Sequence, residues 1–318
     1  MLNLPELTLA KFRFTIEAAE TLYLPEYKGS TLRGGFGHAF RKVVCTMGPI
    51  PCSTCLLFLK CPYPQFFETP IHGDFPPFMR GVKTGPQPFV VEPTLETKQV
   101  YQKGELLEFV LILVGRAIEF LPYFIFTFDQ LGYRGIGRGQ RKFRLKEVAA
   151  GNDVEWQTIY RGDTKTLTAD FPSPITTTAA PLERVELVAL RFLTPTRIKI
   201  HGHLTAGLSF RELVLWLLRR ICTLAFFHMP GVTIDWDWRN ILNSANEIVN
   251  ERQQLRWVDW ERYSNRQETR MKMGGFIGEM TFRGDIARWL HLLRIGALVH
   301  VGKGATFGLG KYEILAGQ

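Results

Sequence analysis

The chain has 318 residues, of which 46% are hydrophobic and 13% aromatic, a composition that excludes an intrinsically disordered protein. The length predicts about two domains, each with apolar residues enough for a packed core. A formal net charge of +9 and an isoelectric point near 9.4 indicate a surface that attracts phosphates, anionic membranes or acidic proteins.

The chain opens with a predicted strand and a predicted helix. Apolar residues alternate over residues 7–17, which is the period of a strand. The triplet Gly29-Ser30-Thr31 is a helix-start signal, and we expect the helix over residues 32–44. Residues 1–10 lack a cationic start followed by a long apolar run, so we expect a soluble, cytoplasmic protein without a secretory signal.

Four of the five cysteines follow this helix, with the spacing Cys45-x6-Cys52-x2-Cys55-x5-Cys61. In a reducing compartment such cysteines are free thiols or metal ligands. The Cys-x2-Cys turn can place two thiolates on one Zn²⁺, and the flanking cysteines can complete a tetrahedral site. We therefore expect a Cys-rich insertion at 45–61 that holds a structural zinc ion, with unligated thiols as the alternative. Four protein ligands would leave no open position for catalysis.

Apolar segments at 89–91 and 106–114, helical material to residue 131 and a strand at 143–148 complete the order βαββαβ. The stretch 106–128 is the nearest approach to a membrane span, but four residues within it make it a poor one: Glu108, Arg116, Glu119 and Pro122. We therefore expect no membrane association.

A glycine-rich loop, Gly132-Tyr133-Arg134-Gly135-Ile136-Gly137-Arg138-Gly139-Gln140, precedes the closing strand. No acidic residue lies between Tyr133 and Lys146. Five basic residues are therefore the candidates for phosphate contacts in the first half: Arg134, Arg138, Arg141, Lys142 and Arg144.

The second half repeats the order of elements. A tract at 163–181, rich in Thr, Pro and Ala, separates the halves. Beyond it we expect a strand at 185–193, a helix at 210–227, a strand at 271–282 and a helix at 286–298. We therefore predict an α+β fold of two tandem ferredoxin-like (RRM-like) domains, at 1–165 and 182–318.

The second domain ends in another glycine-rich loop, at 302–310, which is followed by a short strand-like segment. Its glycines let a backbone approach a ligand closely, and Lys303 and Lys311 supply positive charge. Dinucleotide-binding and P-loop sites need a helix after the glycines, so the context excludes both. We expect this loop to hold a phosphodiester backbone.

Several motifs together point to a family. They are Leu32-Arg33-Gly34-Gly35-Phe36-Gly37-His38, the cysteine cluster, Leu193-Thr194-Pro195-Thr196-Arg197, Arg262-Tyr263-Ser264-Asn265-Arg266-Gln267, Met273-Gly274-Gly275-Phe276 and the terminal loop. With these motifs the chain resembles the RAMP-type endoribonucleases that process CRISPR precursor transcripts. The cysteine cluster resembles one branch of that family.

The resemblance implies an enzyme that cuts CRISPR repeat RNA once, without a catalytic metal or other cofactor. The ribose 2′-OH attacks the adjacent phosphate, and the products carry a 2′,3′-cyclic phosphate and a 5′-hydroxyl. CRISPR repeat RNA is the implied partner, and effector-complex subunits and a second copy of the chain are further candidates. One alternative is a non-catalytic RNA-binding subunit of an effector complex. Another is a zinc-dependent nucleic-acid module.

The family often places a histidine in or near the first helix, and here His38 matches that position. Histidine, with an ordinary pKa of about 6.5, can act as acid or base at cellular pH. Arg41 and Lys42 follow three and four residues later, near the same helix face. Because some members use a His–Tyr–Lys set, we predict His38, Lys42 and Tyr27 as catalytic residues.

Five further residues are predicted to bind RNA: Arg41, Arg197, Arg266, Lys303 and Lys311. His300 competes with His38 as a catalytic candidate because it directly precedes the terminal loop. We interpret His300 instead as a residue that fixes the geometry of the loop.

Overall fold

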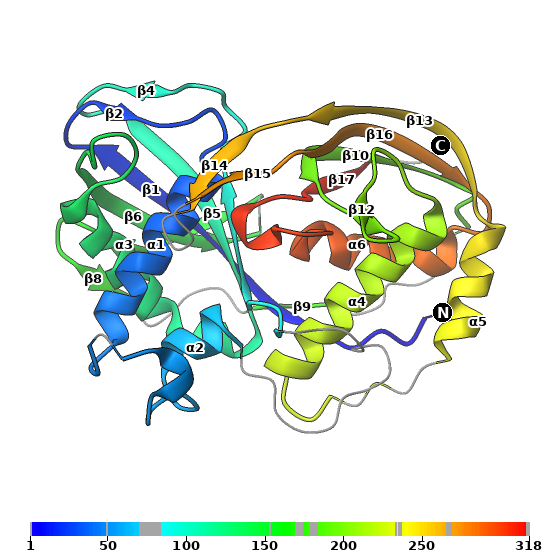
Figure 1. Ribbon diagram of the computed structural model, residues 1–318, viewed down its shortest axis with the longest axis horizontal. Coiled ribbons are helices and arrows are strands. Elements are labelled where there is room, and N and C mark those ends of the chain that lie inside the picture. Colours follow the sequence, from blue (N-terminus) through cyan, green and yellow to red (C-terminus); the bar gives the residue numbers. More distant parts are fainter. Residues whose placement is uncertain are drawn as a thin grey trace.

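A computed structural model describes residues 2–48, 50–69, 84–152, 154–168, 174–177, 184–232, 234, 237–264 and 269–315 (Figure 1). The first domain contains the predicted βαββαβ order: β1 (Thr8–Ala18), α1 (Gly29–Val44), β3 (Phe89–Pro93), β5 (Leu106–Val114), α3 (Leu121–Arg134) and β6 (Phe143–Gly151). The antiparallel strand order β3-β5-β1-β6 is that of a ferredoxin-like sheet. Three strands extend it: β7 (Trp156–Arg161), β8 (Thr166–Leu167) and β9 (Ile175–Thr176).

The second domain repeats this topology with β10 (Leu187–Thr196), α4 (Phe210–His228), β13 (Val249–Val258), β16 (Gly275–Arg283), α6 (Leu290–Val299) and β17 (Tyr312–Leu315). Its strand order is β13-β16-β10-β17. The sequence did not predict β13, because the strand lies at the sheet edge and six consecutive residues at its start are exposed, so no buried alternation marks it.

Smaller elements connect these two frameworks. In the described residues, two-stranded antiparallel sheets pair β2 (Leu22–Tyr23) with β4 (Val100–Tyr101), β11 (Lys199–Ile200) with β12 (His203–Leu204), and β14 (Glu261–Ser264) with β15 (Thr269–Lys272). The short helices are η1 (Cys52–Thr54), α2 (Pro62–Phe67), η3 (Gly115–Phe120), α5 (Trp238–Ser244), η4 (Ala245–Glu247), η5 (Ala287–Trp289) and η6 (Ala305–Phe307). None of the helices in the described part of the chain has both the length and the apolar character needed to span a bilayer.

The core of the first domain lies between its sheet and the two helices α1 and α3. Phenylalanines dominate this core, and the Phe36 ring of α1 stacks on Phe124 and Phe128 of α3, with centroids 5.0 and 4.9 Å apart. Aromatic rings bury large apolar areas and stack favourably, so these contacts hold the two helices together.

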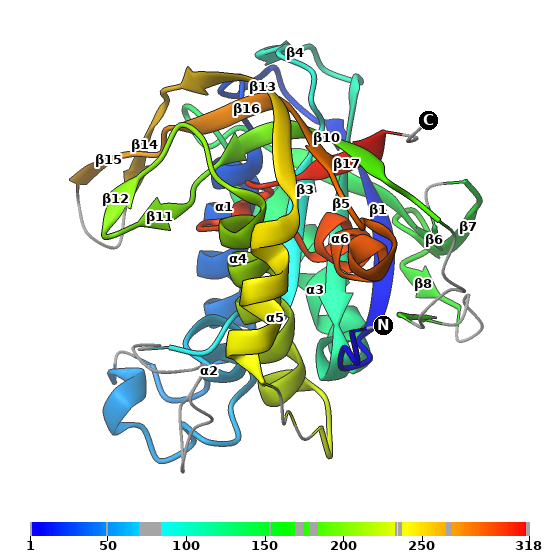
Figure 2. The same ribbon diagram turned by 90° about the vertical axis from the view of Figure 1, so that its right-hand side faces the viewer.

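The two domains share a second core, because α4 and α6 pack against the opposite face of the first sheet (Figures 1 and 2). Strand residues of the first domain, among them Leu9, Ile112 and Val114, belong to the same buried cluster as Leu217 of α4 and Leu293 of α6. Both faces of this part of the first sheet are therefore buried.

Candidate functional site

A groove of about 2480 Å³ runs between the two domains. Pockets for drug-sized ligands hold about 300–1,000 Å³, so this groove has room for a polymer. Its first wall consists of α1, the 135–140 glycine loop and the segment around β2. Its second wall comes from the C-terminal domain and includes Leu193, Arg256, Trp260 and Phe307.

Helix α1 presents one face to this groove and buries the other. Leu32, Phe36 and Phe40 are buried in the first core. The α1 residues that line the groove include Thr31, Gly34, His38, Arg41 and Lys42, whose spacing places these five along one side of the helix. The amphipathic pattern of α1 therefore directs these residues toward the groove.

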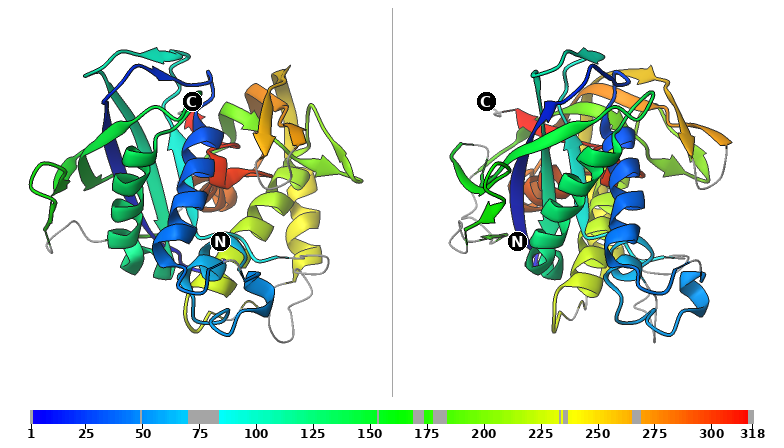
Figure 3. Two further views of the ribbon diagram at one scale, coloured as in Figure 1. Left: turned by 60° about the vertical axis from the view of Figure 1, so that its left-hand side comes forward. Right: turned by 90° about the vertical axis from the view of Figure 1, so that its left-hand side faces the viewer.

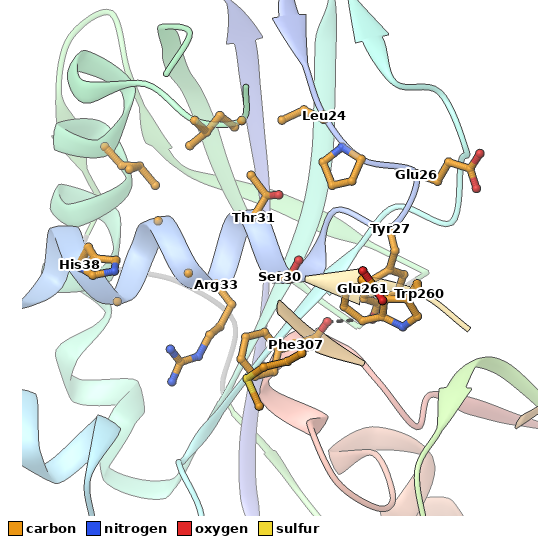
Figure 4. A pocket seen from close by; sticks show the side chains of 18 of the residues that line it. Leu24, Glu26, Tyr27, Ser30, Thr31, Arg33, His38, Trp260, Glu261 and Phe307 are labelled. Carbon is orange, nitrogen blue, oxygen red and sulfur yellow. Dashed lines mark hydrogen bonds between the residues drawn. The ribbon is translucent and has the colours of Figure 1, made fainter. Parts of the chain in front are cut away.

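His38 is exposed on this face (Figure 4). Within the described residues, its imidazole has no hydrogen-bond partner. Lys42 is exposed one turn later, while Arg41 donates a 3.3 Å hydrogen bond to the Ile50 carbonyl and lies over the Tyr63 ring. His38 and Lys42 are therefore accessible to a ligand, and Arg41 is partly held by the cysteine loop.

The first glycine-rich loop borders the same groove. Gly135, Gly137 and Gly139 have positive φ angles of 87°, 68° and 79°, which L side chains rarely adopt. The loop is tied to the β2 segment, because the Arg138 amide donates to the Tyr23 carbonyl at 3.0 Å. This conformation leaves Arg134 and Arg138 exposed along the groove, as predicted for residues that contact phosphates.

Three other basic residues predicted near this loop lie outside the groove lining. Arg141 pairs with Glu20 at 3.4 Å. Lys142 and Arg144 are exposed at the start of β6, where Arg144 alternates with Phe143 and Leu145 of the helix-side core. The five candidates for phosphate contacts therefore do not share one surface, because the strand period turns Arg144 to the face opposite the helices.

The terminal glycine loop docks onto the first domain (Figure 3). The Tyr27 hydroxyl donates to the Phe307 carbonyl at 2.7 Å. Gly308 has a φ of 80°, and a Cβ there would lie 2.6 Å from Pro93 and 2.7 Å from the Val91 carbonyl oxygen. The sequence predicted that these glycines admit a phosphodiester backbone, but Gly308 instead admits the protein's own β3 strand.

Lys303 is the exposed lysine of this loop, and its amide donates to the Arg197 carbonyl at 2.8 Å. Burial, together with the nearby charges of Lys199 and Arg197, lowers the pKa of Lys303. Arg197 is half-buried and donates to the Lys272 carbonyl at 3.1 Å. Both residues lie outside the groove lining, and Arg266 lies outside the described residues.

The ammonium of Lys311, a predicted RNA contact, lies 2.8 Å from Glu92 Oε2 of β3. His300 is fully buried between the Leu309 carbonyl, 3.1 Å from Nδ1, and Glu92 Oε1, 2.6 Å from Nε2. Burial alone would raise the pKa of Glu92, but the hydrogen bond from His300 and the charges of His300 and Lys311 lower it to about 2. His300 therefore fixes the loop, in agreement with our interpretation.

The same docking occupies Tyr27. Burial, reinforced by Glu92, raises the pKa of its hydroxyl well above the ordinary value, so Tyr27 is a weaker acid than a free tyrosine. Its ring also packs on Trp260, with centroids 4.9 Å apart. Although Tyr27 borders the groove, its hydroxyl proton is already in a hydrogen bond to Phe307.

The four clustered cysteines are free, half-buried thiols. Within the described residues no group of three or more His, Cys, Asp or Glu side chains could hold a metal ion. Burial is the main cause that raises the pKa of Cys52 and of Cys61. The described part of the chain therefore gives no support to the predicted zinc site.

Sequence reasoning gave no role to Arg33, although this residue stood in one of the motifs. Its guanidinium lies over three rings, 4.9 Å from Phe67, 5.8 Å from Phe89 and 5.0 Å from Phe307 (Figure 4). It also donates to Gln87 Oε1 at 2.8 Å. Arg33 thus joins the terminal loop to α1 and forms part of the groove floor.

Comparisons with known proteins follow the two halves of the chain. Residues 7–171 match the family model AF_1859_N, an N-terminal domain, and residues 190–312 match that of the CRISPR-associated endoribonuclease Cas6. An uncharacterized protein of Archaeoglobus fulgidus is 23% identical over 299 residues, which cover 92% of this chain and 93% of that protein.

Solved structures share the fold. A chain of a partial Cas6-RT-Cas1–Cas2 complex has a TM-score of 0.59 and 13% identity over 99% of this chain, which spans only 47% of that longer chain. A Cas6 product complex has a TM-score of 0.57 and 16% identity, and the match covers 96% of this chain and 100% of the other. A Thermus thermophilus Cas6 has a TM-score of 0.51 and 15% identity, and the match covers 97% of this chain and 99% of the other. The tandem ferredoxin-like arrangement is therefore that of Cas6 proteins.

The first family model covers more than half of the chain, and the second covers most of the C-terminal domain. The protein belongs to the AF_1859_N family, and its second half is similar to the CRISPR-associated endoribonuclease Cas6.

Proposed function

We propose that the protein is a CRISPR-associated endoribonuclease that cuts repeat RNA in precursor transcripts. The observation that carries this proposal is the interdomain groove, in which α1 exposes His38 beside Lys42 and opposite the second domain. The Cas6 match over residues 190–312 supports the same function.

The charge of the groove suits an RNA ligand. Six basic side chains line it: Arg33, Arg41, Lys42, Arg134, Arg138 and Arg256. Four acidic side chains also line it, so the balance is positive, as protein–phosphate contacts require. Structures of the same fold are described as a Cas6 product complex and a Cas6 substrate mimic complex, which supports RNA as the ligand.

The proposed reaction is attack by the ribose 2′-OH on the adjacent phosphate. The 2′-oxygen loses its proton as it bonds to phosphorus, and the bond from phosphorus to the 5′-oxygen breaks as that oxygen gains a proton. His38 is suited to move one of these protons, and a positioned side chain of this kind contributes about 10²–10⁴-fold to the rate. Lys42 supplies positive charge beside the phosphorane. Because the nucleophile belongs to the RNA, the reaction needs no metal-activated water.

Tyr27 has a different role in this proposal. Its hydroxyl donates to the Phe307 carbonyl, so we assign it to holding the terminal loop against α1 rather than to proton transfer. The raised pKa of the hydroxyl supports this assignment. The catalytic set that we propose is therefore His38 and Lys42.

Incubation of the purified protein with end-labelled CRISPR repeat RNA in EDTA tests the proposal. We expect one cut that leaves a cyclic phosphate, is abolished by His38→Ala, and fails on RNA with a 2′-deoxyribose before the scissile phosphate. His203→Ala is the matched control, because His203 is exposed but does not line the groove. Tight binding without cleavage would instead identify a non-catalytic RNA-binding subunit, and loss of cleavage in EDTA would contradict the metal-independent reaction.

A further inference from the structure

Helix α1 contains four glycines among its sixteen residues: Gly29, Gly34, Gly35 and Gly37. Glycine is among the least favourable residues in a helix interior, because the unfolded chain loses more conformational freedom there than with any other residue. Each of these glycines therefore needs a compensating reason.

Close packing within the protein supplies the reason for three of them. A Cβ added at Gly29 would overlap the Phe307 carbonyl oxygen. A Cβ added at Gly35 would lie 3.2 Å from the Leu131 side chain, and one added at Gly37 would lie 3.1 Å from the Phe67 ring. Gly29 admits the terminal loop, Gly35 admits α3, and Gly37 admits α2. These glycines let other elements approach the helix closely.

Gly34 has no such neighbour. Within the described residues, no atom lies within 4 Å of the position that its Cβ would occupy. Its φ lies outside the left-handed region, so the backbone conformation does not require glycine either. The space above Gly34 belongs to the groove. The packing of the protein itself therefore gives no reason for glycine here.

The position of Gly34 relative to His38 suggests the reason. The two residues are four positions apart on α1, so they are neighbours on one face, about 6 Å apart along the helix axis. An RNA strand that crosses this face of α1 to reach His38 passes over Gly34. Any side chain at position 34 would hold that strand away from the helix, and a displacement of about 1 Å at a reacting centre can cost about 10²-fold in rate.

We propose that Gly34 is a positioning residue that lets the ribose-phosphate backbone of the RNA lie directly on α1, so that the scissile phosphate reaches His38. This inference rests on the proposed function. Gly29 lets Phe307 approach the backbone of α1 closely, and Gly35 does the same for Leu131. In this proposal, Gly34 lets the RNA approach the helix backbone in the same way.

The test compares Gly34→Ala and Gly34→Leu with the wild-type protein in single-turnover cleavage of repeat RNA, RNA binding and thermal unfolding. Gly34→Ala should raise Tm by about 1–2 °C, because alanine favours the helix and its methyl group meets no protein atom. It should nevertheless lower the cleavage rate at saturating RNA by about tenfold or more, and Gly34→Leu should lower it further. A purely structural role would lower Tm together with activity.

Asn243→Ala is the matched control. Asn243 is exposed on α5, at the right-hand edge of Figure 1 and outside the groove lining, and its replacement favours a helix in the same way. This variant should raise Tm without any change in cleavage. The control separates an effect of higher stability from an effect of the methyl group in the groove.

Unchanged cleavage and RNA affinity in Gly34→Ala would overturn the inference while leaving the proposed function intact, and so would a lowered Tm. If the wild-type protein binds repeat RNA without cutting it, the dissociation constant for the RNA tests the inference instead. Gly34→Ala must then bind the RNA at least about tenfold more weakly than the wild-type protein. If the wild-type protein neither binds nor cuts the RNA, the proposed function fails and this inference fails with it.

Discussion

Glu92 and His300, 208 positions apart in the chain, join the two domains through a buried contact of 2.6 Å between Glu92 Oε1 and His300 Nε2. The other carboxylate oxygen of Glu92 binds the Lys311 ammonium at 2.8 Å. Glu92 thus holds both ends of the terminal glycine loop against β3.

Glu92→Gln should destabilise the protein by about 3 kcal/mol, because it leaves the Lys311 ammonium without its carboxylate partner in a largely buried site. The free energy of unfolding from urea titrations at pH 7 measures this effect. Glu105→Gln is the matched control, because Glu105 pairs with Lys98 at 2.9 Å on the exposed surface. A surface pair of this kind contributes little, so the control should change stability hardly at all. Equal effects of the two variants would contradict the buried role of Glu92.

The low pKa of Glu92 predicts a pH dependence of stability. Its pKa is about 2 in the folded protein and close to 4.5 in the unfolded chain, so the unfolded state binds the proton more readily. The stabilisation is therefore complete above pH 4.5 and is lost as the pH falls toward 2. The difference in unfolding free energy between wild type and Glu92→Gln should shrink over that interval. A difference that stays constant from pH 6 to pH 2 would count against the ionised carboxylate.

Tyr27→Phe separates anchoring from catalysis. It removes the hydroxyl that donates to the Phe307 carbonyl and should cost about 1 kcal/mol of stability. Cleavage of repeat RNA by the folded variant should stay within a few-fold of wild type, whereas His38→Ala should abolish it. Loss of cleavage in Tyr27→Phe at unchanged stability would return Tyr27 to the catalytic set.

Arg138→Ala and Arg144→Ala test which face of the first domain meets RNA. Arg138 lines the groove, while Arg144 lies outside it on β6. Each phosphate contact to a single strand contributes about 0.7 to the slope of log affinity against log salt. Arg138→Ala should therefore reduce the slope by about that amount, and Arg144→Ala should leave it unchanged. Binding titrations at several salt concentrations measure the slopes of both variants. A larger effect of Arg144→Ala would indicate that the RNA binds the face of the sheet that carries Arg144.

Gly29→Ala should strongly destabilise the protein, because the new Cβ would overlap the Phe307 carbonyl oxygen. Both atoms belong to elements that other contacts hold in place, so relief requires displacement of the terminal loop or of α1. Thermal unfolding should show a lower Tm than for wild type. An unchanged Tm would show that the loop is not firmly docked on α1.

The sequence predicted elements well where the pattern is local. The alternation of apolar residues in β1 and the apolar stripe of α1 mark the residues that face the core of the first domain, and both elements form as predicted. Helix α1 begins at Gly29 rather than at residue 32, and Gly29 packs against the docked loop. Strand β13 was missed because its exposed edge position leaves no apolar alternation.

The site was predicted only in part. His38, Arg41 and Lys42 share the groove because helical spacing brings them to one face, which is a local property. The pairing of Lys311 could not be predicted, because a basic residue beside glycines has the same local pattern whether it faces a ligand or a buried carboxylate. Glu92, which decides between these outcomes, lies 219 positions away.

By itself, the sequence determined the βαββαβ order of the first domain, the elements of the second domain apart from β13, and the groove-facing stripe of α1, since strand and helix periods arise from neighbouring residues. Only the tertiary structure decided that the terminal glycine loop docks on β3 and that Tyr27 and His300 hold it there. It also decided that, of the α1 glycines, Gly34 alone has no described atom within 4 Å of the position that a Cβ would occupy. The reason is physical: burial and charge pairing depend on contacts between distant segments, which the local periodicity of a chain does not record.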